Sequence, residues 1–269
     1  MPQTSIFTSV INSYLPEPHA SLLNGILFGI NLKVNQGFYQ QMRTVGLLHL
    51  VVLSGMNIVL MSAIITDLTS RFSKQISTMI TILTIILFII FVQPQAPIVR
   101  AGIMSIATFA GIIYGKRIYV YYSFILSAFF IWMFWPDWIR SISFQLTYAA
   151  TLGILLFGKT NTKEDKTGFK SKVFQTVWSE IKPSFAAQLF TAPIIFIYFR
   201  QISLIAPLSN LMVSFLVGPL MFFGFLTSIL GKINWSLGLI PSYICYGLLS
   251  YMIYVINVLS KIPYALINF

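Results

Sequence analysis

The chain has 269 residues, of which 57% are hydrophobic and 9% charged, and this composition excludes an ordinary soluble domain. A single cysteine, two histidines and six scattered carboxylates exclude a disulfide framework and a zinc or two-metal hydrolytic site of the usual spacing. The net charge of +11 agrees with a membrane protein whose basic loops set its orientation, and also with a polyanionic cargo. We therefore expect an all-α, polytopic membrane bundle, and the location of the basic residues must separate these two explanations.

The first 44 residues are expected to form an interfacial segment that leads into the membrane. Residues 1–30 contain no Lys or Arg, so they lack the basic region of a signal peptide and cleavage is not expected. The prolines in residues 15–19 predict a turn, and His19 is expected to be a solvated residue of that loop. The apolar stretch 20–30 is too short to span a bilayer, which favours an interfacial or re-entrant helix.

Eight apolar stretches are predicted to cross the membrane, since a hydrocarbon core of roughly 30 Å needs about 20 helical residues. The predicted spans are residues 45–66, 76–92, 98–114, 119–135, 139–157, 185–199, 204–230 and 237–259. The seventh contains Pro207, Gly218, Pro219 and Gly224, so we predict a broken segment that forms one span or two half-helices. Residues 45–259 would then be the bundle of one domain covering residues 1–269.

The basic residues are distributed unequally between the two sides that these spans define. One side receives eleven of the seventeen, including six lysines in residues 159–182, which we interpret as a lysine-rich, flexible surface loop. The positive-inside rule places this side in the cytoplasm and both chain ends outside. Much of the net charge is therefore explained by topology.

The first predicted span carries polar residues at membrane depth. Its residues 46–57 read GLLHLVVLSGMN and include His49, Ser54 and Asn57, with Gly55 between the last two. Lipid offers such groups no hydrogen-bond partner, so they must face protein or a water-filled cavity. They either join this helix to its neighbours or form the wall of a membrane path, and their spacing leaves both interpretations open.

Arg100 is the one basic residue that topology does not explain, because it lies just inside the third predicted span. Insertion scales give a cost of at least ~2.5 kcal/mol for arginine at a helix centre, and less near an end, from which its side chain can reach the interface. No carboxylate lies within any predicted span, except for Asp67 at the end of the first. This scarcity counts against a proton-driven transporter and favours a path that tolerates anions.

These residues resemble the ComEC competence proteins, membrane channels that admit single-stranded DNA during natural transformation. GLLHLVVLSGMN resembles the family signature GLxHLLAISGLH, and LPEPHASLLNGILFG at residues 15–29 resembles its LPEPxAxLLxGLLLG segment. Residues 38–43 resemble the family's approach to the first span. Further blocks follow in family order: VRAGIM at 99–104, GKR at 115–117, SFQL at 143–146, AAQL at 186–189 and SNL at 209–211. The matches cover nearly the whole chain.

Three features depart from the family pattern. Asn57 replaces the second histidine of the signature, and because asparagine cannot change charge near neutral pH, a two-histidine role does not carry over. Phe215 stands where the family often has proline. Full-length members also carry an OB-like domain before this region and a metallo-β-lactamase-like nuclease domain after it. The chain is expected to correspond to the membrane domain alone, with no enzymatic activity.

The resemblance implies a channel that conducts single-stranded DNA across the cytoplasmic membrane. Such a path needs cationic and backbone donors for phosphates and aromatic faces for bases. The predicted path residues are His49, Ser54, Gly55, Asn57, Arg100, Gln145, Gln188 and Asn210. For Gln145, Gln188 and Asn210, interhelical hydrogen bonding is favoured over DNA contact. No metal, cofactor or catalytic residue is expected. The implied partners are single-stranded DNA, the bilayer, a separate nuclease, a DNA-binding receptor, a cytoplasmic translocation motor and a second copy of the chain.

Two alternative functions stay open at this stage. A small-solute secondary transporter would show inverted repeats and a closed pocket at the membrane midplane. An intramembrane serine protease is suggested by Ser54-Gly55 and His49, but Val52 stands where rhomboid proteases have their first glycine. His49 and Ser54 are also about 140° apart around a helix, which separates a nucleophile from its base. The protease is the less favoured of the two.

Overall fold

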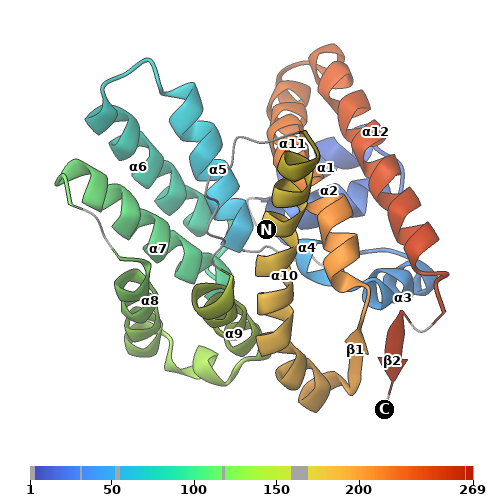
Figure 1. Ribbon diagram of the computed structural model, residues 1–269. Coiled ribbons are helices and arrows are strands. Elements are labelled where there is room, and N and C mark those ends of the chain that lie inside the picture. Colours follow the sequence, from blue (N-terminus) through green and yellow to red (C-terminus); the bar gives the residue numbers. More distant parts are fainter. Residues whose placement is uncertain are drawn as a thin grey trace. The chain divides into compact units, whose positions relative to one another are not determined.

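The computed structural model describes residues 4–30, 32–51, 55–116, 119–158, 169–263 and 265–268. Over these residues the chain forms α-helices joined by short turns, one 3₁₀ helix and two three-residue strands (Figure 1). The helices are α1 Thr4–Tyr14, α2 His19–Phe28, α3 Gln36–Thr44, α4 Leu48–Val51, α5 Gly55–Leu68, α6 Lys74–Val92, α7 Ala96–Ile113, α8 Val120–Phe134, η1 Pro136–Arg140, α9 Ile142–Phe157, α10 Phe169–Phe199, α11 Ala206–Ile233 and α12 Trp235–Leu259. The strands are β1 Gln201–Ser203 and β2 Leu266–Asn268. The prediction of an all-α bundle is confirmed, with this small ribbon as an addition.

The chain divides into two compact units whose segments alternate along the sequence. The first unit comprises Met1–Asn35, Leu48–Ile139 and Leu216–Met252. The second comprises Gln36–Leu47, Arg140–Phe215 and Ile253–Phe269. The long helices α11 and α12 each contribute to both units.

Helix α2 lies at the centre of the first unit. Every residue from Ala20 to Phe28 is buried, and Gly29, with a φ of 65°, ends the helix in the left-handed conformation. Gly224 of α11 lets that helix approach closely, because a Cβ there would lie 2.8 Å from Leu27 Cδ1. An interfacial helix would expose one polar face, whereas α2 is covered on all sides, so of the two expected arrangements the re-entrant helix agrees better with this burial.

Helices α5 to α8 form the other part of this unit, coloured from blue through green in Figure 1. Hydroxyl groups join α5 to α6 within the apolar surroundings, with Thr66 Oγ1 lying 3.3 Å from Thr81 Oγ1. Gly102 gives α7 close access to α6, since a Cβ there would meet Ile89 Cδ1. Small residues and hydroxyl groups are the usual means by which membrane helices associate.

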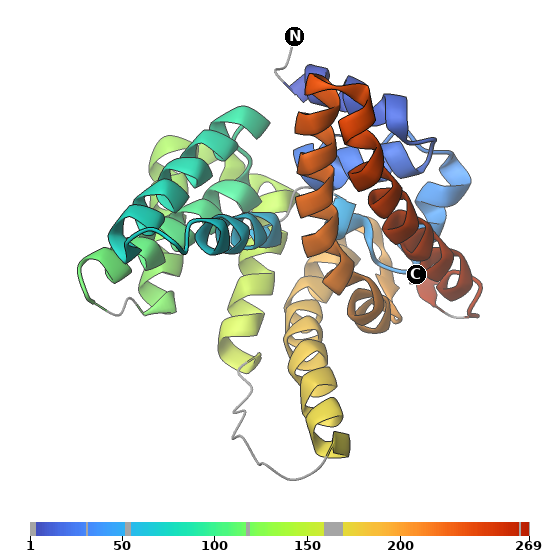
Figure 2. The same ribbon diagram turned by 90° about the horizontal axis from the view of Figure 1, so that it is seen from above.

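In the second unit, α9 and α10 lie side by side (Figure 2). Gly153 makes this possible, because a Cβ on it would overlap the carbonyl oxygen of Ala186 and lie 2.9 Å from Phe190 Cδ2. Strands β1 and β2 pair antiparallel, with Ile202 opposite Ile267. A further hydrogen bond from Leu204 N to Ala265 O, 3.0 Å long, extends this ribbon to the start of α11.

Five helical stretches in the described part of the chain are long and apolar enough to cross a membrane. They are Lys74–Val92, Ala96–Ile113, Ile181–Tyr198, Ala206–Ile233 and Trp235–Leu259, and they correspond to the second, third, sixth, seventh and eighth predicted spans. The other three predicted spans correspond to shorter apolar helices, α5, α8 and α9, of 14, 15 and 16 residues. The prediction of a helical membrane protein is thus confirmed, with five of its eight spans at full length.

The predicted break in the seventh span is wrong. Helix α11 continues through Pro219 for 28 residues. Pro207 is the second residue of α11, where the missing N–H has no intrahelical partner to lose. Pro219 removes one backbone hydrogen bond from the interior of α11, and a packed membrane helix tolerates this loss without breaking.

The predicted loop 159–182 is wrong in its second half. Residues 159–168 lie outside the described residues, but Phe169 begins α10, which runs on to Phe199. In the sequence, apolar residues recur every four positions from Phe169 through Val173 and Val177 to Ile181, which is a helical period. The high lysine content favoured a flexible loop, although this apolar period indicates a helix.

Candidate functional site

The signature segment begins at a turn that requires glycine. Gly46 has a φ of 73°, in the left-handed region, and a Cβ there would lie 2.6 Å from Ala206 Cβ. This turn separates α3 from α4, so the helix starts at Leu48 and not at Val45 as the apolar run suggested. Ser54 and its two predecessors lie outside the described residues.

Three hydroxyl and amide groups fix the chain just before and within this turn. Ser203 Oγ donates to Thr44 O at 2.7 Å, and Ser209 Oγ donates to Val45 O at 2.5 Å. Gln188 Nε2 in turn donates to Ser203 O at 2.6 Å. Gln188 therefore supports the start of the signature through β1. Ser203 and Ser209 are functional candidates that the sequence reasoning missed, although Ser209 directly precedes Asn210 in a family block.

The two other amide candidates of this unit also form protein contacts. Asn210 Nδ2 lies 3.3 Å from Ser184 Oγ and joins α11 to α10, which is the interhelical contact expected for it. Gln145 Nε2 lies 3.5 Å from the carbonyl oxygen of Arg140, across the turn before α9. Both side chains are half-buried.

Asn57 is a buried residue of α5 that holds the end of α2. Its side chain is 1% exposed, and its Nδ2 donates to Ile26 O at 2.8 Å. Ile26 lies in the last turn of α2, where backbone carbonyls lack a partner within the helix. The amide therefore acts as a cap for the central helix of the first unit, a task that needs a donor and not a titratable group.

Gly55 and Arg100 bring two of the family blocks into contact. A Cβ on Gly55 would lie 2.8 Å from Arg100 Nη2 and 3.0 Å from Ala101 Cβ, so the absence of a side chain at this position makes room for α7. Arg100 is half-buried, and its Nη1 lies 3.9 Å from the sulfur of Met104 one helical turn later.

The two histidines lie in different surroundings. His49 is exposed on α4. His19 is half-buried at the start of α2, with Nε2 3.0 Å from Ser250 Oγ and its ring stacked on Tyr246 at 4.6 Å between centroids. Burial lowers the pKa of His19, and the nearby Glu17 carboxylate opposes this. The prediction of a solvated loop residue is therefore wrong, because α12, which lies far away in sequence, packs over His19.

The predicted path residues fall into both compact units. His49, Gly55, Asn57 and Arg100 belong to the first, and Gln145, Gln188 and Asn210 to the second. Of these, Gly55 and Arg100 are in contact. Within the described ranges, no three His, Cys, Asp or Glu residues gather closely enough to hold a metal ion.

Comparison with known proteins identifies one family and one curated relative. The model of a family described as Competence protein matches residues 26–269. A protein of Bacillus subtilis (strain 168), named ComE operon protein 3, is 24% identical over 214 residues, which are 77% of this chain and 26% of that protein. The chain thus spans about a quarter of the length of the relative that it matches. No solved structure matches the chain.

Proposed function

Because the chain belongs to the competence protein family, we propose that it is the membrane channel through which single-stranded DNA crosses the cytoplasmic membrane in natural transformation. The observation that supports this most is the contact between Gly55 of the signature and the guanidinium of Arg100. It places a permanent positive charge against the segment in which the resemblance to the family is most specific.

Arg100 has the properties that a phosphate contact requires. Guanidinium keeps its charge at any physiological pH and offers its donors in a planar fork that matches two phosphate oxygens. A passing strand presents one phosphate per nucleotide. Successive phosphates can therefore bind the same fixed guanidinium in turn as the strand moves. Conduction needs binding that is favourable enough for entry and weak enough for release, and one half-buried arginine meets both conditions better than a cluster would.

The remaining path candidates act as supports in this proposal. Asn57 caps α2, Gln188 holds the turn before α4, and Asn210 joins α11 to α10. His49, exposed on α4, and Ser54 keep their predicted place along the path. Residues 1–269 act as a single competence-type domain.

The chain supplies passage and no chemistry in this proposal. DNA degradation during uptake would come from a separate nuclease, capture from a DNA-binding receptor, and pulling force from a cytoplasmic motor. Purified protein incubated with single-stranded DNA and Mg²⁺, Mn²⁺ or Zn²⁺ should leave the strand intact. Metal-dependent cleavage that substitutions in this chain abolish would contradict this.

The proposed orientation has the lysine-rich residues 159–182 in the cytoplasm and both ends outside, since eleven of the seventeen basic residues then lie inside. Reporter fusions after Lys166 and at the C-terminus measure this directly. Opposite sides are expected, and the same side for both would refute the arrangement.

Substitution of Arg100 tests the proposed site. Arg100→Lys keeps a charge without the fork and should retain part of the uptake, whereas Arg100→Gln should reduce it by roughly tenfold or more, because a charged hydrogen bond is lost. Both variants should reach the membrane in normal amounts, because lysine keeps the charge that the site already accommodates and the neutral glutamine is less costly to bury there. Arg71→Gln, at an exposed position before α6, is the matched control and should be silent.

The same two measurements separate this role from structural ones. If the Arg100 side chain only extends to the membrane interface, both variants should have nearly normal uptake. If Arg100 stabilises the fold, both variants should show lower membrane abundance together with lower uptake. Normal uptake by Arg100→Gln would remove Arg100 from the path.

A further inference from the structure

Helix α3 differs in composition from the rest of this apolar chain. Of its nine residues, Gln36–Thr44, Met42 is the buried one. Phe38, Met42 and the following Val45 recur at four and three residues, so they lie on one side of the helix. Met42 and Val45 are fully buried, and Phe38 is half-buried. This apolar side packs against the protein.

The opposite side of α3 carries amides, a phenol and a guanidinium. Gln36, Tyr39, Gln40 and Arg43 occupy positions i, i+3, i+4 and i+7, which places them on one helix face. Gln36 and Gln40 are exposed, Tyr39 is 42% exposed and Arg43 is half-buried. We call these four residues the α3 face.

Hydrogen bonds hold the end of α3 against the β ribbon of the second unit. Thr44 O accepts from Ser203 Oγ of β1 at 2.7 Å. Arg200 precedes Ser203 by three residues and is exposed. Three residues of extended chain reach at most about 11 Å, so Arg200 lies within that distance of the residue that holds α3.

No carboxylate offsets the positive charge in the segments that meet at this ribbon. Residues 18–66, which include α3, contain no Asp or Glu. Residues 200–215 and 253–269, which supply the two strands, contain Arg200 and Lys261 and likewise no Asp or Glu. These segments therefore attract a polyanion and do not repel it.

The α3 face has the groups that a nucleic-acid single strand requires. A guanidinium binds phosphate, an aromatic ring stacks on a base, and amides form hydrogen bonds with base edges and sugars. A helix that only rests on lipid headgroups is typically rich in Lys and Arg on its polar face. Here Gln36 and Gln40 occupy such positions. They add nothing to the attraction for anionic lipid, but they can pair with bases.

We propose that the α3 face binds single-stranded DNA at the entry to the path, with Tyr39 stacking on a base and Arg43 contacting a phosphate. This inference rests on the proposed function for its ligand, and on the proposed orientation, which places the residues before the first span outside. Arg43 lies three residues before Gly46, where the signature begins. A strand bound to α3 is therefore held next to the start of the signature segment.

The first experiment measures the contribution of the bases. The full chain is placed in dioleoylphosphatidylcholine nanodiscs, and binding is followed by fluorescence anisotropy. One labelled probe is a thymidine strand of about 15 nucleotides, and the other is an abasic strand of the same length. Tyr39→Ala should lower the preference for the thymidine strand about fivefold, because one stacked base is lost. Tyr39→Phe keeps the ring and should retain the preference. Tyr243→Ala, an exposed tyrosine of the first unit, is the control and should also retain it.

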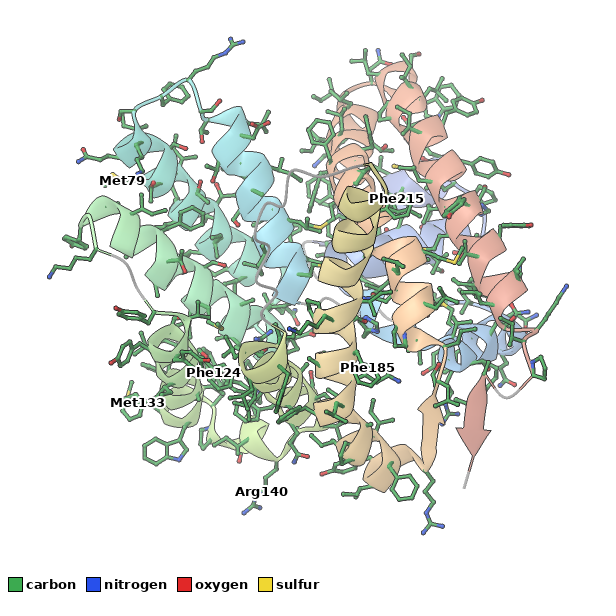
Figure 3. All side chains as sticks on the ribbon, in the orientation of Figure 1. Met79, Phe124, Met133, Arg140, Phe185 and Phe215 are labelled. Carbon is green, nitrogen blue, oxygen red and sulfur yellow. The ribbon has the colours of Figure 1, made fainter. Side chains whose placement is uncertain are left out.

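The second experiment measures the phosphate contact through its salt dependence. For single strands, the slope of log affinity against log salt changes by about 0.7 for each phosphate contact, so Arg43→Gln should make the slope shallower by about this amount. Tyr39→Ala should leave the slope unchanged. Arg140→Gln is the matched control: Arg140 is exposed in the same unit, and Figure 3 shows its side chain pointing away from the ribbon. Its slope should equal that of the wild type. An unchanged slope in Arg43→Gln together with an unchanged preference in Tyr39→Ala would overturn the proposal.

Photochemical cross-linking of the wild type gives a third measurement if a variant does not fold. Loss of folding would be recognised by reaction of the buried Cys245 with a thiol dye. A thymidine strand that carries 5-iodouracil is irradiated with the wild-type chain, and the adducts are located by mass spectrometry. An adduct on Tyr39 is expected. Adducts confined to residues outside α3 would refute the site.

Failure of this site and failure of the channel give different results. If strands cross a bilayer through the wild type while both α3 variants bind them normally, the α3 site is wrong and the channel stands. If the wild type binds strands through Tyr39 and Arg43 but does not conduct them, the α3 site stands and the channel is wrong.

Discussion

Gly55 of α5 and Arg100 of α7 are in direct contact: a Cβ on residue 55 would lie 2.8 Å from Arg100 Nη2 and 3.0 Å from Ala101 Cβ. Gly55 of the signature leaves space for the guanidinium of Arg100 in the next family block, and Arg100 supplies a positive charge at this position.

Gly55→Ala tests this division of roles. The far end of Arg100 can move aside, so the strain should stay at the lower end of the roughly 1–3 kcal/mol typical of overpacking. We expect near-normal membrane abundance but reduced DNA uptake, because the guanidinium is displaced. The control is Gly247→Ala in α12, where no atom lies within 4 Å of the added Cβ, and this variant should behave as wild type. Full uptake by Gly55→Ala would show that the position of Arg100 does not matter.

Most of the helices could be predicted from the sequence, but most of the contacts could not. Long apolar runs such as α6 and α12 have few alternatives in a membrane protein, so their type and approximate ends follow from composition. The burial of α2 does not follow from composition, because a ten-residue helix that is mainly apolar can lie in an interface or in a core. The contact between Gly55 and Arg100 joins two separate family blocks. A resemblance between sequence motifs does not show which of the motifs are close in space. The contact between Arg100 and Met104 could have been predicted from the sequence, because Met104 lies four residues after Arg100 on the same helix face.

Asn57→Asp tests the cap on α2. The substitution preserves shape but removes the Nδ2 donor, which leaves Ile26 O without that hydrogen bond in a buried position. A lost partner at a buried carbonyl costs roughly 1–3 kcal/mol, so the thermal midpoint of unfolding should fall by several degrees. Unfolding in detergent can be followed by a thiol-reactive dye, because the single cysteine, Cys245, is fully buried in the folded chain.

Asn234→Asp is the matched control for this experiment. Asn234 is exposed and uses its Oδ1 to accept from Ser236 N at 2.9 Å, and aspartate retains that oxygen. Its midpoint should stay unchanged. Equal midpoints for the Asn57 and Asn234 variants would contradict the assigned role of Asn57.

His19 should make stability depend on pH. Because burial lowers its pKa, the folded protein binds fewer protons on His19 than the unfolded chain does between the two pKa values. Stability should therefore be full above the ordinary histidine pKa of about 6.5 and fall as pH drops from there towards the folded pKa. His19→Gln keeps a polar side chain without a proton equilibrium, and it should reduce the difference in unfolding midpoint between about pH 7.5 and about pH 5.

Ser250→Ala separates titration from the hydrogen bond. It removes the hydroxyl 3.0 Å from His19 Nε2 but leaves the imidazole, so it should lower stability at both pH values and preserve the pH dependence. A pH dependence that His19→Gln leaves unchanged would assign the effect to another group.

Strand passage across a planar bilayer measures directly whether the chain conducts single-stranded DNA. The purified chain is inserted into the bilayer, a single strand of a few dozen nucleotides is added on the side of negative potential, and strands that reach the other side are amplified and counted. A voltage pulls a polyanion without any motor, so the chain alone suffices for the measurement. We expect recovery of the single strand but not of the equivalent duplex, and a marked loss of recovery with Arg100→Gln. Passage of small solutes without the strand, or equal recovery with Arg100→Gln, would contradict it.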